Sequence, residues 1–120
     1  MKQYVEAHPW KIIETDFSTG DNMVTESLLS IGNGKMGQRA NFEETYSGET
    51  LVGSYLAGVY YPDKTRVGWW KNGYPEYFAK VLNSVNWLGL HILLDETVLD
   101  LAKLTPLDYC GELDMEKGLL

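Results

Sequence analysis

Turn-forming residues interrupt this chain so often that no segment keeps an apolar period of 3.6 residues over ten residues or more. Clusters such as Ser18–Asn22, Gly32–Gly37 and Asn72–Gly73 separate short runs that are rich in β-branched and aromatic residues. Short strands joined by turns bury their apolar faces by stacking one sheet on another. The sequence therefore predicts a mainly β fold, an antiparallel β-sandwich or part of one.

The apolar runs have the length of single strands. Residues 38–46 fit either one helical turn or a strand, residues 61–77 are expected to form a long loop, and residues 78–85 fit no single class. Asp95 and Glu96 can turn the chain between two runs, which predicts a hairpin there. The expected strands cover residues 9–17, 24–31, 51–60, 87–94, 98–101 and 107–113.

Length and charge limit the classes of protein to consider. The chain has 120 residues, the size of one domain, and an apolar share of 44%, which is normal for a globular core. Its net charge of -7 argues against a nucleic acid partner and against an anionic membrane surface. Cys110 is the only cysteine, so no disulfide forms within the chain. Without an apolar leader at the start of the sequence, a cytoplasmic protein is expected.

The sequence ends on a strand-like segment, residues 113–120, which closes with two leucines. Natural domains usually end in polar, dispensable residues. We therefore expect residues 1–120 to be one portion of a β-sandwich that belongs to a longer protein.

Gly32–Gly37 matches the pattern G-x-G-x-x-G of dinucleotide-binding loops. Such a loop must lie between a strand and a packed helix, and a carboxylate must end the next strand. The segment that follows is short and charged and reaches another turn at Ser47–Gly48, and the next strand carries no carboxylate. A tight turn between two strands, held with Asn33, is the favoured interpretation.

Three glutamates near Arg39 raise the question of acid–base catalysis. Glycoside cleavage needs two carboxyl groups across the scissile bond, one protonated and one ionised. Glu43 and Glu44 are adjacent, so on a strand they point to opposite faces and cannot act as one pair. The favoured interpretation is structural: Arg39 forms an ion pair with Glu43 or Glu44, the other stays solvated, and Glu26 belongs to the same structural group.

An aromatic loop offers a second candidate site. Aromatic faces suit the C–H faces of sugars, and amides suit their hydroxyl groups. The loop that runs to Tyr77 could therefore bind carbohydrate, or it could pack against another part of a larger protein. The residues expected to contact a substrate are Trp69, Trp70, Asn72 and Tyr74.

Other catalytic groups lack the spacing that their chemistry needs. His8, His91 and Cys110 stand far apart in the sequence and predict no metal site. Ser27 and Ser30 have no base at a recognisable spacing, so a hydrolytic triad is not supported. We expect no catalytic residue and no metal in this chain.

Four motifs follow one another along the chain. They are ESLLSIGNGKMGQR at 26–39 with Glu43 and Glu44, GSYLAGVY at 53–60, KVLN at 80–83 with Asn86 and Trp87, and LDM at 113–115 with Gly118 and Leu119. In this order they resemble one known family, the N-terminal domain of glycoside hydrolase family 65, whose members are disaccharide phosphorylases for maltose, trehalose and kojibiose. The similarity extends from Trp10 to Leu120, and the insert at residues 64–77 is most similar to the maltose phosphorylase branch.

The resemblance implies a larger architecture than these residues supply. Family members carry a large N-terminal sandwich of the galactose-mutarotase-like supersandwich type, a helical linker, an (α/α)6 barrel and a small C-terminal sheet. The catalytic acid and the phosphate site lie in the barrel. The implied reaction is inverting phosphorolysis of an α-glucoside, with inorganic phosphate as co-substrate and no other cofactor.

Two hypotheses for the role of the chain follow. In the first it is the non-catalytic start of a disaccharide phosphorylase, inert by itself, which supports the barrel and a homodimer interface. In the second it is a free-standing carbohydrate-binding module that uses the loop Trp69–Tyr77. In either case, open strand edges predict that the isolated chain self-associates.

Overall fold

The structure is a computed structural model that describes residues 2–64, 73 and 75–120. It is mainly β, with antiparallel sheets, which confirms the predicted fold class. The helices are α1 (Asn22–Leu28) and the 3₁₀ helix η2 (Leu101–Lys103). The strands are β1 (Glu6–Ala7), β2 (Lys11–Glu14), β3 (Ile31–Gly32), β4 (Met36–Gln38), β5 (Ser54–Leu56), β6 (Tyr60–Lys64), β7 (Tyr77–Val81), β8 (Leu93–Leu94), β9 (Thr97–Val98) and β10 (Gly111–Asp114).

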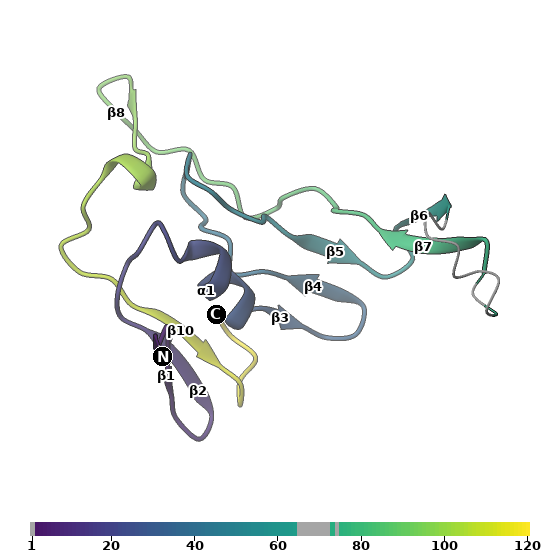
Figure 1. Cartoon of the computed structure of the whole chain (residues 1–120). Helices are drawn as coiled ribbons and strands as arrows, with labels where there is room; N and C mark the ends of the chain where they lie inside the picture. Colours follow the sequence, from purple (N-terminus) through teal and green to yellow (C-terminus); the bar gives the residue numbers. More distant parts are fainter. Residues whose placement is uncertain (1, 65–72, 74) are drawn as a thin grey trace.

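Two small sheets form the body of the molecule (Figure 1). The first has the order β1-β2-β10, so it joins the beginning of the chain to its end, and the second has the order β3-β4-β5. Both are antiparallel, with Leu113 opposite Ile12 in the first and Gly37 opposite Tyr55 in the second. Helix α1 lies where the two sheets meet, close to β10 and β3 (Figure 1).

The prediction of a strand over residues 24–31 is wrong, because this segment forms α1 and leaves only Ile31–Gly32 as a strand. The residues that α1 buries, Asn22, Thr25 and Glu26, do follow a helical spacing, and buried Leu29 continues it. Since most of this inner face is polar, a search for apolar periodicity misses the helix.

Other predictions hold in part. The hairpin around Asp95 and Glu96 is confirmed as β8 and β9, and both turn residues have positive φ, 47° and 67°. The long loop expected over residues 61–77 is wrong at its beginning, because β6 extends to Lys64. The unassigned segment 78–85 begins within β7, and of the strand expected over 87–94 only Leu93–Leu94 forms.

β6 and β7 form a separate two-stranded hairpin, here called the arm, which projects from the body (Figure 1). The arm and the β8–β9 hairpin give the chain an elongated shape with extents of 56 × 41 × 29 Å. Its radius of gyration is 17.8 Å, whereas a compact domain of this length has about 14 Å. The chain is therefore far from a closed, spherical unit.

Little apolar surface is buried in the described residues. The buried apolar side chains are Leu29 and Leu113. Beside them, the rings of Phe17, Phe42 and Tyr109 pack together, with centroids 5.6 Å apart for Phe17 and Phe42 and 5.2 Å for Phe17 and Tyr109. Many large apolar residues stay exposed, so these layers cover only part of their own apolar faces.

Candidate functional site

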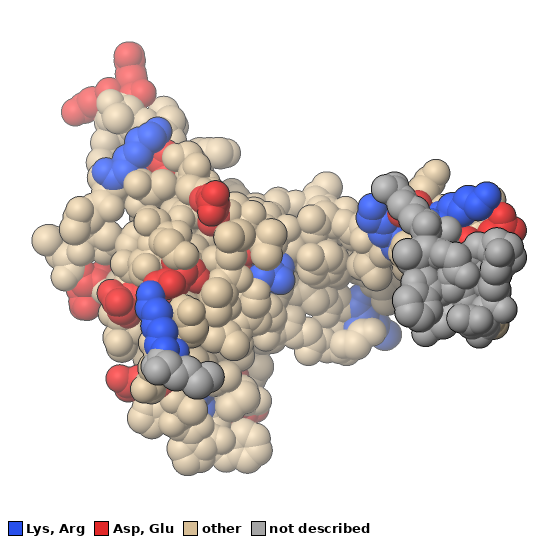
Figure 2. Space-filling view, viewed as in Figure 1, with Lys and Arg blue, Asp and Glu red and all other residues tan. Residues whose placement is uncertain are grey.

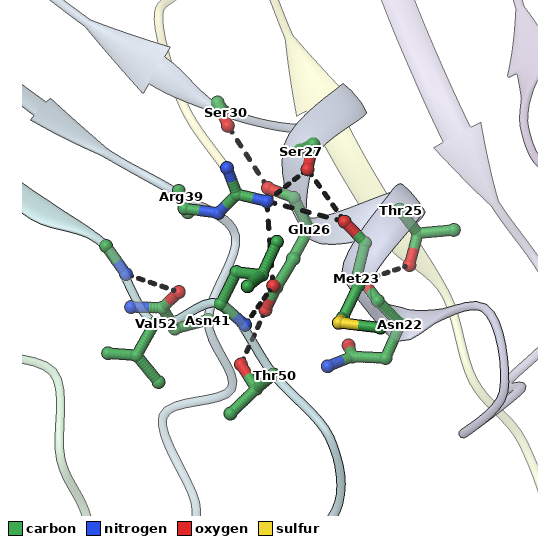
Figure 3. A network of polar contacts seen from close by, with 12 residues as sticks. Asn22, Met23, Thr25, Glu26, Ser27, Ser30, Arg39, Asn41, Thr50 and Val52 are labelled. Carbon is green, nitrogen blue, oxygen red and sulfur yellow. Dashed lines mark hydrogen bonds and ion pairs between the residues drawn. The ribbon is translucent and has the colours of Figure 1, made fainter. Parts of the chain in front are cut away.

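Glu26 is the most deeply buried charged residue of the described chain, with 2% of its surface exposed. One carboxylate oxygen, Oε2, accepts a hydrogen bond from the Thr50 hydroxyl at 2.7 Å, and Oε1 accepts one from the Leu51 backbone N–H at 2.5 Å. Arg39 Nη2 lies 3.6 Å from Oε1 (Figure 3). Both oxygens are therefore occupied, as a buried carboxylate requires.

Arg39 connects this carboxylate to the helix. Its Nη2 also donates to the hydroxyl of Ser27 and to the Met23 carbonyl oxygen, the latter at 3.4 Å (Figure 3). Its backbone N–H donates to the Gly53 carbonyl at 2.9 Å. The predicted ion pair of Arg39 with Glu43 or Glu44 is wrong: its partner is Glu26, which α1 turns inward.

Asn33 stabilises the glycine turn between β3 and β4. Its Oδ1 accepts hydrogen bonds from the backbone N–H groups of Lys35 and Met36, both at 3.0 Å, and Gly34 takes φ +81°. β4 follows the turn directly, and Gly32 pairs with Gly37. The segment is a strand–turn–strand unit, not the strand–loop–helix unit of a dinucleotide site, so the tight-turn interpretation is confirmed.

Amide side chains hold the second sheet to its surroundings. Asn41 Oδ1 accepts from the Gly53 N–H at 3.3 Å. Asn83 accepts from the Ser54 N–H with its Oδ1 and donates from its Nδ2 to the Val52 carbonyl. Ser54, which is 1% exposed, donates its hydroxyl to Gln38 at 2.7 Å. These contacts fix residues 38–54 around Glu26.

A cleft of about 430 Å³ opens beside Glu26, between the two sheets. Apolar side chains line part of it, Leu29 and Phe42 among them. The acidic residues that line it are Glu14, Glu26, Glu43, Glu44 and Glu112. Glu43 is exposed and Glu44 half-buried, and the backbone at Glu43 accepts a hydrogen bond from the Leu90 N–H at 2.6 Å.

Glu14 and Tyr109 form a second buried polar contact in this cleft. Tyr109 Oη donates to Glu14 Oε2 at 3.1 Å, and Glu14 is 5% exposed. Burial raises the pKa of the Glu14 carboxyl, although hydrogen bonds from Thr25 and Tyr109 partly oppose that rise. Burial, followed by the nearby charge of Glu14, raises the pKa of Tyr109 as well.

The aromatic loop cannot be placed against this site. Trp69, Trp70, Asn72 and Tyr74 lie outside the described residues, so their contact with a substrate stays a prediction. Tyr77 is described, and it lies on β7 with 54% of its surface exposed.

The described residues show little catalytic chemistry. The Glu26 carboxylate already binds three groups, so it is unsuited to donate a proton to a leaving group. His91 Nδ1 lies 2.9 Å from the Thr45 hydroxyl. Within residues 2–64, 73 and 75–120, no group of His, Cys, Asp and Glu side chains is arranged to hold a metal ion.

Comparison with known proteins decides what this arrangement belongs to. The family described as "Glycosyl hydrolase family 65, N-terminal domain" matches residues 12–120. The chain belongs to this family. The motif that carries the match in the sequence, residues 26–39, is the segment that builds the buried Glu26–Arg39 pair.

Relatives within glycosyl hydrolase family 65 are much longer. A maltose phosphorylase of Bacillus subtilis is 49% identical over 116 residues, which are 96% of this chain and 15% of that protein. A kojibiose phosphorylase of Thermoanaerobacter brockii is 30% identical over 92% of this chain and 13% of its own length. The chain thus spans about a seventh of the curated relatives that it matches.

A solved structure shares the fold. The protein named "Putative kojibiose phosphorylase from human microbiome" superposes with a TM-score of 0.82 at 36% identity, over 98% of this chain and 16% of that one. None of the helices in the described part of this chain has the length and apolar character that crossing a bilayer requires.

Sequence reasoning missed several residues of the site. Thr50 belongs to no motif, and Ser27, although it lies within residues 26–39, gives no sign of its partner, because a single hydroxyl gains its role only from the partner that folding supplies. Glu14 offered a weak signal, as a carboxylate that directly follows Ile12 and Ile13 in a predicted strand. Asn41, which is 8% exposed, lies between Arg39 and Glu43 of the motif and could have been added to its structural group.

Proposed function

We propose that this chain is the N-terminal, non-catalytic part of a disaccharide phosphorylase. The parent enzyme would cleave an α-glucoside such as maltose with inorganic phosphate, with inversion, to β-glucose 1-phosphate and glucose. A carboxylic acid protonates the leaving oxygen while phosphate attacks the anomeric carbon from the opposite face. The 49% identity to a protein named maltose phosphorylase supports this substrate class.

One observation above all supports the non-catalytic role: polar side chains are buried in this chain, while many large apolar side chains are exposed. The deepest side chains include Glu26 and Ser54, whereas large apolar residues such as Trp10, Val85 and Leu94 are 60%, 76% and 63% exposed. A carboxylate that is fully engaged in hydrogen bonds stabilises loops and does not react. Exposed apolar faces, in turn, require a covering partner.

We assign that cover to the remainder of the same polypeptide. Residues 1–120 would then be the first portion of a β-sandwich that supports a catalytic barrel and contributes to a homodimer. The parent enzyme would be a cytoplasmic protein that uses phosphate as co-substrate and needs no other cofactor.

The decisive experiment compares the 120-residue chain with the protein encoded by its complete gene. Both are incubated with maltose, with and without phosphate, and glucose 1-phosphate is measured. We expect phosphate-dependent release by the complete protein and none by the 120-residue chain. Release by the 120-residue chain alone would overturn the non-catalytic role, and a complete protein that produces only glucose would overturn phosphorolysis.

The alternative function, a carbohydrate-binding module, draws on the exposed aromatic residues that border the loop. Tyr61 and Tyr77 on the arm are 58% and 54% exposed, and such rings suit sugar faces. Titration of the 120-residue chain with maltose, followed by tryptophan fluorescence, tests this. A saturable change that disappears in Trp69→Ala or Trp70→Ala, yet persists in the exposed control Trp10→Ala, would favour the module.

A further inference from the structure

The chain reverses its direction directly after β10, in a turn that many hydrogen bonds hold. Asp114 and Leu119 exchange two backbone hydrogen bonds, at 2.8 Å and 3.1 Å between N and O. Asp114 also accepts from the Lys117 N–H at 3.0 Å, with its Oδ1, and from the Gly118 N–H at 2.8 Å, with its carbonyl oxygen. Gly118 takes φ +65°, which glycine adopts without steric cost. The turn therefore starts an antiparallel hairpin on one edge of β10.

The hydrogen-bond pattern shows which backbone groups of β10 point away from β2. The N–H and C=O of Asp114 lie on the outer side of the strand, where the hairpin starts. The next residue, Met115, donates its N–H to the Trp10 carbonyl at 2.8 Å, on the inner side. Because these groups alternate between the two sides of a strand, Leu113 then bonds to β2, and Glu112 turns its N–H and C=O outward. In the described part of the chain β2 is the only strand beside β10, so the Glu112 groups lie on an open edge.

This outer edge of β10 borders the cleft beside Glu26. Glu112 lines that cleft, and so do Leu119 and Leu120, which lead into it from the turn. Figure 1 shows the C-terminus beside α1. Leu119 and Leu120 are 59% and 52% exposed, so they cover little of the cleft themselves. The chain thus enters the cleft along β10, in the direction of an antiparallel strand.

We propose that the polypeptide which follows Leu120 adds a fourth strand to the sheet β1-β2-β10 and fills the cleft beside α1. The turn sets the register, so that Leu120 lies opposite Leu113. The first residue after Leu120 then forms a bonded pair with Glu112, whose N–H and C=O both gain partners. The inference rests on one part of the proposed function, the continuation of the polypeptide beyond Leu120, and it does not depend on phosphorolysis. It assigns the cleft to a strand and not to a ligand.

Two observations favour this occupant over a second copy of the chain. Leu119 is already bonded to the outer edge of β10, so a strand from another molecule would have to displace it together with Leu120. The matched family is an N-terminal domain, and this chain covers 15% of the maltose phosphorylase and 13% of the kojibiose phosphorylase. A segment that is covalently attached beside the edge pairs with it without the entropy cost of association.

Hydrogen exchange at the Glu112 amide tests the pairing. In the 120-residue chain this N–H faces the open cleft and should exchange fast. In the protein encoded by the complete gene it donates to the added strand, so its exchange should be roughly tenfold slower or more. The Leu113 amide, which bonds to Ile12 in β2, is the internal control and should exchange slowly in both proteins.

A proline at the same position removes the donor. Glu112→Pro loses an N–H that does not bond to β2, and proline is tolerated at such edge positions. Glu112→Ala is the matched control, because both variants lose the carboxylate that accepts a 2.6 Å hydrogen bond from Lys11. In the 120-residue chain the two variants should have similar thermal unfolding midpoints. In the complete protein, the amides of the segment that follows Leu120 should exchange several-fold faster in Glu112→Pro than in Glu112→Ala.

Three results would overturn the proposal. They are a Glu112 amide that exchanges equally fast in the two proteins, one that is already protected in the 120-residue chain, and equal exchange after Leu120 in Glu112→Pro and Glu112→Ala. Protection in the 120-residue chain that grows with concentration would assign the edge to a second copy. The proposed function fails separately: a complete protein that protects the Glu112 amide but produces only glucose keeps the added strand and loses phosphorolysis.

Discussion

The surroundings of Glu26 and the arm are built in opposite ways. Around Glu26, charged and polar side chains are buried, and hydrogen bonds from Thr50, Leu51 and Arg39 compensate for the loss of water. On the arm, Tyr60, Tyr61 and Val81 are 58%, 58% and 61% exposed, although they belong to a regular hairpin. In the first region most buried polar groups are paired within the described chain, with Arg39 Nε and Asn41 Nδ2 as exceptions, whereas the apolar side chains of the arm stay uncovered.

This difference shows what each region contributes. A buried ion pair adds little net stability compared with apolar packing, but it becomes costly when one partner is removed. Exposed apolar strands gain stability only when another surface covers them. The Glu26 region therefore contributes to the local fold, while the arm leaves apolar surface for another segment to cover.

The largest effect should come from removing the charge at the centre of the buried network. Glu26→Gln leaves Arg39 without its ionised partner and the Leu51 N–H with a weaker acceptor. We expect the free energy of unfolding to fall by about 3 kcal/mol, measured by urea denaturation followed by circular dichroism.

The matched control is Glu43→Gln, which removes an exposed carboxylate of the same cleft. This change should alter stability by less than about 0.5 kcal/mol. If the two variants lost equal free energy of unfolding, the buried Glu26–Arg39 pair would contribute no more to stability than an exposed carboxylate. The contrast between the Glu26 region and the arm would then fail.

A smaller loss is expected from the glycine turn. Gly34 has φ +81° and no atom near the position of an added Cβ, so the cost of Gly34→Ala is one of backbone conformation alone. We expect it to be about 1–2 kcal/mol. Gly37→Ala in the same hairpin has an ordinary φ and only Ile31 O at 3.9 Å, so it should cost less. Thermal unfolding of both variants measures the difference in stability between them. A larger loss in Gly37→Ala than in Gly34→Ala would contradict the prediction.

The pH dependence of stability separates a carboxyl group whose pKa is raised by burial from one whose pKa is lowered by hydrogen bonds. Burial raises the pKa of Glu14, so as the pH rises above its unfolded value of 4.5 the unfolded state ionises first and stability falls. Asp114 behaves in the opposite way: the hydrogen bond from the Lys117 backbone lowers its pKa, and stability is lost as the pH falls below 3.8.

Glu14→Gln tests this assignment. As the pH rises above 4.5, the parent should lose stability relative to the variant, because only the parent must ionise a buried carboxyl. Urea denaturation at several pH values measures the two curves. Parallel curves over this range would mean that Glu14 ionises as freely in the folded state as in the unfolded state.

Sequence reasoning predicted the fold class because turns and short apolar runs determine it directly. The glycine turn and the hairpin at Asp95 and Glu96 were local features, and both were confirmed. Helix α1 was missed because its inner face carries Asn22, Thr25 and Glu26. Polar residues are usually expected to be exposed. Only the folded structure shows why these are inside: Asn22 and Glu26 find partners in residues 38–54, and Thr25 binds the Asn22 carbonyl oxygen.

The candidate site was predictable as a set of residues but not as a set of contacts. Glu26 and Arg39 were both assigned structural roles from the motif, yet Arg39 was paired with the wrong glutamate. Spacing along an assumed strand favoured Glu43 or Glu44, whereas the helix brings Glu26 to Arg39 from 13 positions away. Because residues 24–31 were expected to form a strand and not a helix, the prediction gave Arg39 the wrong partner, although Glu26 and Arg39 themselves were both identified.

The smallest effect should come from the arm, in Tyr61→Ser at concentrations too low for association. Tyr61 is 58% exposed, so its removal takes away little buried surface, and the free energy of unfolding should change by less than about 0.5 kcal/mol. Leu29→Ala, at a position that is 2% exposed, provides the contrast and should cost about 2–5 kcal/mol. A Tyr61→Ser variant that is destabilised at low concentration would show that the arm packs within its own chain, and the contrast between the Glu26 region and the arm would no longer hold.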